Sequence, residues 1–106
     1  MNPEPDDADL LRRYARDKSE PAFAEIVRRH INLVYASALR RVGGDAHLAE
    51  DVTQQVFTAL AGNAKTVADR SILVGWLHLT TRNQAAQVVR TERRRQAREQ
   101  EAHQMN

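Results

Sequence analysis

Residues 75–95 read GWLHLTTRNQAAQVVRTERRR, and this stretch decides the fold that the sequence predicts. It begins with large apolar side chains, continues with a row of amides and hydroxyls, and ends in arginines. Apolar residues at three- and four-residue steps indicate an amphipathic helix. One continuous helix would therefore be anchored in a core at its first end and present cations at its last end. The amides between them suit base edges, so the pattern favours nucleic acid over a small substrate.

The length and composition predict one domain with a single modest core, because the chain has 106 residues and 42% of them are apolar. It contains no cysteine, which excludes disulfides and thiolate metal sites. The longest apolar stretch, residues 72–77, is far shorter than a membrane span. The N-terminus also lacks the basic start and apolar centre of a signal peptide. We therefore expect a cytoplasmic protein that binds no membrane.

Charge is distributed unevenly, although the formal net charge is only +2. Residues 1–9 contain four acidic residues and no basic one, whereas residues 82–98 contain six arginines and one glutamate. Such asymmetry predicts a polyanion-binding end and an acidic leader. We expect three parts, which are a flexible acidic leader at 1–8, a helical domain at 9–95 and a frayed polar tail at 96–106.

Three helices are predicted before the opening stretch, because side chains suited to helix N-termini precede three segments with apolar periodicity. The second helix has a proline in its first turn, where the missing N–H costs little, and a glycine pair ends it. The caps are Asp6 or Asp7, Ser19 and Asp45, and the helices span about residues 8–17, 20–41 and 46–61.

The segment that joins the third helix to the last one shows no apolar periodicity. We therefore predict a loop at residues 62–70. Ser71 or Asp69 can cap the last helix, which runs from about Ile72 to at least Arg95. No segment alternates as a strand would. The predicted fold is all-α, a compact bundle of about four helices.

The aromatic and histidine side chains have simpler interpretations than binding. Trp76 could stack on unpaired bases, but its apolar neighbours favour a place in the core. His30 and His78 lie in or beside apolar stripes and are predicted to be packed. His47 and Asp51 are spaced as some metal pairs are, but no third ligand is evident. No phosphate loop or nucleophile–base pair is present either, so we expect no enzyme, no metal and no cofactor.

Three motifs in this order resemble region 2 of the sigma-70 family of bacterial RNA polymerase initiation factors, most closely the extracytoplasmic-function type. Residues 49–60, AEDVTQQVFTAL, are similar to the family pattern A-E-D-x-x-Q-E-x-F. Residues 75–83 are similar to G-W-L-x-x-[IL]-A-R-N, and the arginine-rich end at 90–98 follows. The resemblance covers about residues 9–95. The chain departs from the pattern at Gln55, where glutamate is usual, and at residues 78–81, which replace an aromatic–basic–Ile–Ala run.

A polar face of the third helix is the candidate protein-binding surface. Asp51 and Gln55 are one turn apart and can accept hydrogen bonds from a partner helix. The resemblance implies that this partner is the clamp coiled coil of the polymerase β′ subunit, and that Gln54 contributes to the same contact. It also implies an anti-sigma factor as a second partner, which would mask this face.

The candidate DNA-binding residues fall into two groups. The resemblance implies that the loop holds a flipped base of the melted −10 element on the non-template strand. On the last helix, amides suit adenine edges and arginines suit phosphates. The loop candidates are Asn63, Lys65, Thr66, Asp69, Arg70 and Ser71, and the helix candidates are Asn83 and Gln87 for bases and Arg82, Arg90, Arg93 and Arg94 for the backbone.

The function implied is promoter recognition and melting driven by binding, with no need for ATP. The alternative is a helical protein–protein adaptor whose basic tail only makes it soluble. A basic amphipathic helix at a membrane surface is disfavoured, because no large apolar residues are interleaved with the arginines after Val89.

Overall fold

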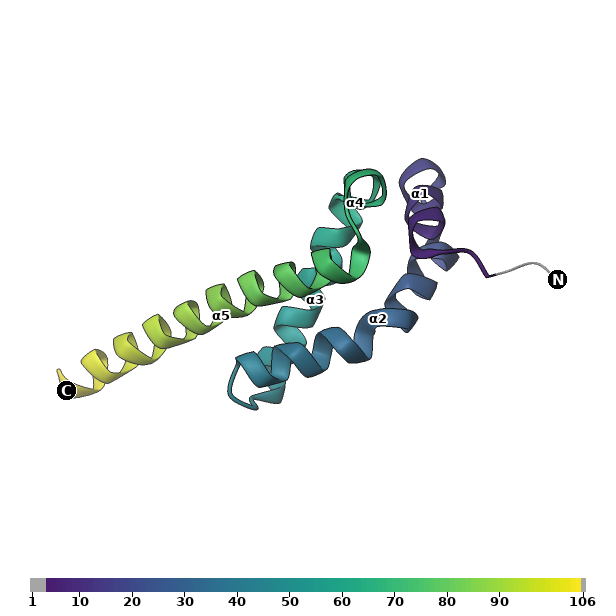
Figure 1. The fold of residues 1–106 in the computed structure, drawn as a ribbon. Coiled ribbons are helices and arrows are strands. Elements are labelled where there is room, and N and C mark those ends of the chain that lie inside the picture. The colour runs from purple at the N-terminus through teal and green to yellow at the C-terminus, as the bar shows by residue number, and fades with distance from the viewer. Residues whose placement is uncertain (1–3, 106) are drawn as a thin grey trace.

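Five α-helices and no strand are found in residues 4–105, which are the residues that this computed structural model describes (Figure 1). The all-α prediction is confirmed, with one helix more than expected. Residues 1–3 of the expected leader and the last residue of the expected tail lie outside the described range. The helices are α1 (Asp7–Asp17), α2 (Glu20–Arg41), α3 (Ala46–Gly62), α4 (Ala64–Arg70) and α5 (Leu73–Gln104).

The first three helices begin where the sequence predicts. Each cap side chain accepts a hydrogen bond from the backbone N–H three residues later, which satisfies a donor that the helix itself leaves free. Of the two candidates at α1, Asp6 is the cap. The bonds are Asp9 N to Asp6 Oδ1 (2.8 Å), Ala22 N to Ser19 Oγ (3.3 Å) and Leu48 N to Asp45 Oδ1 (3.1 Å).

The glycine pair after α2 reverses the chain. Gly43 and Gly44 have φ values of 70° and 83°, a left-handed conformation that side chains with a Cβ adopt only at a cost. The Gly44 N–H donates to the carbonyl of Leu39 at 2.9 Å, which satisfies one of the last acceptors of α2. As a result α3 returns alongside α2 and the two helices pack together.

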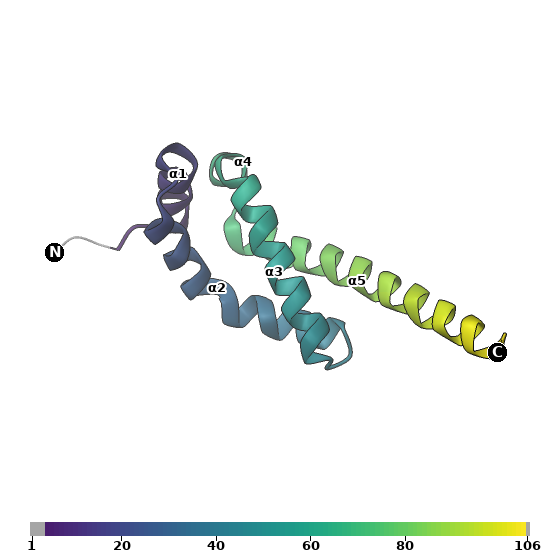
Figure 2. The ribbon, with the colours of Figure 1, turned by 180° about the vertical axis from the view of Figure 1, so that it is seen from behind.

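The core lies where α2, α3 and α5 meet, and α1 and α4 close it at one end (Figures 1 and 2). Complete burial of a valine, leucine or isoleucine side chain contributes about 1.5–3 kcal/mol to the free energy of folding. A few such residues therefore dominate the stability of a domain this small. The largest fully buried side chains are Leu11, Ile26, Val52, Val56, Leu60, Val67, Leu77 and Thr81.

The predicted loop at 62–70 is wrong, because residues 64–70 form the helix α4. Its buried side chains are Ala64, Val67 and Ala68, which are spaced three and four residues apart. A helix this short is unstable alone, and α4 is held by packing against α1, which both ribbon views place beside it. The apolar period was present in the sequence, but two alanines carry it, so no large-residue stripe marked it.

Helix α5 begins within one residue of the predicted start and continues past Arg95, but its cap and its last part differ from the prediction. Its N-cap is Ile72, whose side chain makes no capping hydrogen bond, so both predicted caps, Ser71 and Asp69, are wrong. At the other end the expected frayed tail is helical through Gln104. Ion pairs from Arg95 to side chains one turn before and one turn after it support this extension. The distal part projects from the body, and the chain measures 68 × 23 × 22 Å (Figure 1).

The buried side chains of α5 follow one another at four-residue steps. Leu73 and Leu77 are buried, and the stripe continues through Thr81 and Ala85. Trp76 is half-buried and packs against the core, which confirms its core interpretation. Thr80 and Gln84 are half-buried.

The two histidines predicted to be packed behave differently. His30 is largely buried, whereas His78 is exposed, so the packing prediction fails for His78. It fails because α5 turns that position away from the stripe formed by Leu77 and Thr81.

No helix in the described range is long and apolar enough to cross a membrane.

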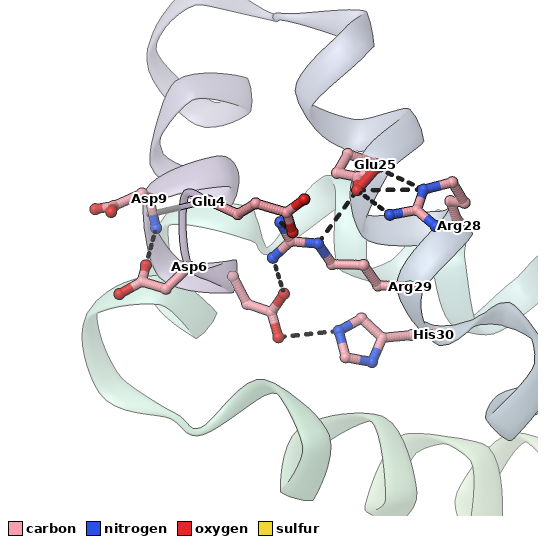
Figure 3. A network of polar contacts seen from close by, with 8 residues as sticks. Glu4, Asp6, Asp9, Glu25, Arg28, Arg29 and His30 are labelled. Carbon is pink, nitrogen blue, oxygen red and sulfur yellow. Dashed lines mark hydrogen bonds and ion pairs between the residues drawn. The ribbon is translucent and has the colours of Figure 1, made fainter. Parts of the chain in front are cut away.

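The acidic leader is attached to α2 by a polar network (Figure 3). The Asp7 carboxylate accepts a hydrogen bond from Arg29 at 3.2 Å and lies 2.9 Å from His30 Nε2. Glu4 forms a longer ion pair with Arg29, at 3.7 Å. The described part of the segment that we expected to be flexible is therefore tied to α2 at residues 4 and 7.

Glu25 belongs to the same network and makes the folding stability of the domain depend on pH. The neighbouring Arg28 lowers the pKa of Glu25 from its ordinary 4.5 to about 2, chiefly through hydrogen bonds to the carboxylate. Because the folded pKa is the lower one, the ionised carboxylate stabilises the fold above pH 4.5, and this contribution is lost as the pH falls toward about 2.

We expect Glu25→Gln to flatten the decline of the unfolding free energy between these pH values. The effect is modest, because Arg28 is exposed and solvent screens the pair. Urea unfolding followed by circular dichroism across the interval measures it. Glu20→Gln, which removes an exposed carboxylate near the start of the same helix, is the control and should keep the wild-type slope. Equal slopes for all three proteins would contradict the assignment.

Candidate nucleic-acid and protein interfaces

The outer side of α5 presents an amide and a row of arginines to solvent. Asn83, Arg90 and Arg94 are exposed and follow one another at seven- and four-residue steps, which places them along one side of the helix. Arg82 and Arg93 are also exposed and lie on the adjoining side. Within residues 4–105, none of these four arginines forms an ion pair, so their charges are available to a ligand.

The arginines of residues 90–98 differ in whether a carboxylate pairs with them. The guanidinium of Arg95 is held by Glu92, with Nε to Oε2 at 3.1 Å, and also by Glu99. The same contact lowers the pKa of Glu92, so this carboxylate stays ionised and paired. Arg98, by contrast, is exposed, forms no ion pair within the described range, and lies one turn beyond Arg94. It is a further candidate, which the four-residue step from Arg94 could have indicated from the sequence alone.

The candidates in the predicted loop instead lie on or beside α4. All six are exposed, but two of them already have partners within the chain. Asn63 Nδ2 donates to the carbonyl of Ala59 at 2.7 Å, and the carboxylate of Asp69 lies 3.4 Å from Arg12 Nε on α1. Arg12 also donates to the carbonyl of Ala68, at 3.3 Å. Among the described residues, Lys65, Thr66, Arg70 and Ser71 form no such side-chain hydrogen bond.

The fold brings the three candidates of α3 together. Asp51, Gln54 and Gln55 are exposed and line two neighbouring hollows between α3 and α5. The hollows have volumes of about 410 and 420 Å³ and share Asp51 and Gln55. Gln87 lines the first hollow, beside these α3 residues, while Asn83 lines neither. The two amides that the sequence grouped as a base-reading pair therefore have different surroundings.

The sequence and the fold agree with one known family. The family described as sigma-70 region 2 matches residues 26–95, a segment that contains every candidate DNA-binding and protein-binding residue but not α1. The ECF RNA polymerase sigma factor SigE of Mycolicibacterium smegmatis is similar, with 36% identity over 70 residues, which are 66% of this chain. Those residues are 26% of SigE, so the chain spans about a quarter of that relative's length.

No solved structure was found to match the chain. The resemblance inferred from the acidic-amide, Gly-Trp-Leu and arginine motifs is nevertheless confirmed by the family match over most of its expected range. Taken with the all-α fold, the match shows that this chain belongs to the sigma-70 region 2 family, a domain of transcription initiation factors.

Proposed function

We propose that this domain acts in an initiation factor of the extracytoplasmic-function type. It binds core RNA polymerase through α3, at the clamp coiled coil of β′, and captures bases of the −10 element on the non-template strand. Binding alone drives strand opening in this scheme, so the domain itself needs no ATP. We also propose a cytoplasmic location, because core RNA polymerase would have to be reached there.

The outer face of α5 carries the DNA half of the proposal. The first half of helix α5 is anchored in the core by Leu73 and Leu77, while Asn83 and the unpaired arginines face solvent. Single-stranded DNA offers phosphates along its length, and each cation that replaces a condensed counterion strengthens binding. An amide among these cations can then distinguish bases by the edges that it bonds.

The α4 segment supports capture of an unstacked base. Flipping a base costs a few kcal/mol, which contacts at the receiving site must repay. Lys65 and Arg70 offer cations for phosphate, and Thr66 and Ser71 offer hydroxyls for a base edge. Asn63 and Asp69 would first have to release the Ala59 carbonyl and Arg12, so we assign them supporting parts.

The exposed Asp51, Gln54 and Gln55 support the polymerase half of the proposal, since they can accept hydrogen bonds from a basic partner helix. An anti-sigma factor that covers the same face would prevent polymerase binding. We therefore propose the α3 face as the site at which such a factor silences the domain.

Fluorescence anisotropy with labelled single-stranded oligonucleotides tests the DNA half. We expect tighter binding to −10-like than to scrambled sequences, and an affinity that falls steeply with salt. Arg94→Ala should weaken binding to all sequences and reduce the slope of log affinity against log salt by about 0.7, the value of one lost phosphate contact on a single strand. Asn83→Ala should lower the preference between sequences.

Arg28→Ala is the matched control, because this exposed arginine of α2 is already paired with Glu25. It should leave both the affinity and the salt slope unchanged. Equal affinity of the wild-type domain for every sequence would argue for the alternative, an adaptor whose basic tail only makes it soluble.

A further inference from the structure

Helix α4 presents its two cations from a surface that it shares with α1. It packs chiefly against α1, and both ribbon views place the two helices side by side (Figures 1 and 2). Lys65 and Arg70 are exposed on α4 and, among residues 4–105, neither of them forms an ion pair. The cations to which the proposed function assigns phosphate are therefore available to a ligand.

Lys65 is unpaired although an acidic residue lies one turn further along the same helix. Asp69 follows Lys65 by four residues, and side chains at this spacing are neighbours on a helix surface. Oppositely charged residues at this spacing can pair, as Arg95 and Glu99 do on α5. The carboxylate of Asp69 instead lies 3.4 Å from Nε of Arg12 on α1. An arginine of another helix therefore binds the carboxylate that Lys65 could have bound.

The guanidinium of Arg12 is held at the end of α4 by two contacts. Its Nη2 donates to the backbone carbonyl of Ala68 at 3.3 Å, next to the carboxylate of Asp69. A guanidinium has several donors in one plane, so it can bond both groups together. The Arg12 side chain is 51% exposed, so the ion pair contributes little to folding stability. The consequence of this pair lies in the charges that it leaves free on α4.

We propose that Arg12 is a positioning residue of the DNA-binding surface, because it holds the carboxylate of Asp69 away from Lys65. The inference rests on the proposed function, in which Lys65 binds a phosphate of the captured strand. Without Arg12, Asp69 would pair with Lys65 within α4 and withdraw this cation from the phosphate. Helix α1 then supports DNA binding without touching DNA, although the family match begins after it.

Arg12→Ala tests the assignment by fluorescence anisotropy with −10-like single strands across a salt series. We expect the affinity to fall about two- to fivefold, because Lys65 becomes paired. The slope of log affinity against log salt should decrease by up to about 0.7, the value of one phosphate contact on a single strand, although Arg12 itself contacts no phosphate. Lys65→Ala should decrease the slope in the same way.

Asp69→Asn separates this role from a merely structural one. The variant also loses the ion pair with Arg12, so it should weaken DNA binding as Arg12→Ala does if the pair only holds α4 in place. We expect it instead to bind the same strands slightly more tightly, because no carboxylate remains to pair with Lys65. Adding Arg12→Ala to Asp69→Asn should then change neither the affinity nor the salt slope further.

Arg13→Ala is the matched control. It removes the same charge from the next position of α1, which is exposed, and Arg13 forms no ion pair among residues 4–105. This variant should keep the affinity and the salt slope of the wild type. Circular dichroism verifies that each variant folds.

The outcomes separate the inference from the function on which it rests. If Lys65→Ala weakens binding but Arg12→Ala does not, or if Asp69→Asn weakens it too, the inference fails and the proposed function stands. An equal loss in Arg13→Ala would also overturn the inference, since the change of net charge would then explain the effect. If Lys65→Ala changes nothing, the proposed phosphate contact of α4 fails and the inference fails with it.

Discussion

Asp51→Arg is expected to abolish capture of core RNA polymerase while the chain stays helical. The carboxylate of Asp51 is exposed, forms no ion pair among residues 4–105, and lines both hollows between α3 and α5. Removing one partner of a charge pair that is desolvated on binding costs about 2–5 kcal/mol, and reversing the sign adds repulsion. A loss of at least about a hundredfold in affinity follows. Pull-down and competition binding measure it, with circular dichroism to verify the fold.

The control makes the same change of charge elsewhere. Glu101→Arg alters the net charge equally, but this exposed residue lies near the distal end of α5. Its binding of core polymerase should match that of the wild type. If Asp51→Arg and Glu101→Arg bind equally, the α3 face does not hold the polymerase.

Leu77→Ala is expected to destabilise the domain by about 2–5 kcal/mol, the range for truncating a buried leucine. Leu77 is 2% exposed and anchors α5 in the core. A domain of this size has a total stability of about 5–15 kcal/mol, so the loss is a large part of it. Urea unfolding followed by circular dichroism measures the change, and DNA affinity should fall where the unfolded population becomes appreciable.

Leu79→Ala removes the same atoms from the same helix, but its side chain is 50% exposed. It should cost little, because surface truncations leave no cavity. A similar loss in both variants would mean that α5 is not anchored through Leu77.

The sequence predicted what depends on local chemistry. Asp6, Ser19 and Asp45 were recognisable because a capping side chain bonds a backbone N–H only three residues away. Helix α4 was missed, because its stability comes from packing on α1, a helix far away in the sequence. The cap of α5 was misjudged for a similar reason, since Ile72 makes no capping bond and burial of Leu73 fixes the helix instead.

The candidate sites likewise were predictable where they depend on local spacing and not where they depend on long-range packing. Motif spacing was sufficient to propose the acidic-amide face and the arginines, and each proposed residue is exposed. The pairing of Asp69 with Arg12 joins residues 57 positions apart, so no local pattern could have indicated it. The position of Gln87 beside Asp51 depends in the same way on how α5 crosses α3.

Helix α1 lies outside residues 26–95, the segment that the family matches, yet it packs against α4 and contributes the buried Leu10 and Leu11 to the core. A fragment trimmed to residues 26–95 would leave Val67 and Ala68 facing water and would deprive Asp69 of its cation. The unit that folds is thus wider than the unit that homology recognises. Residues outside the matched segment can therefore still decide whether that segment keeps its shape.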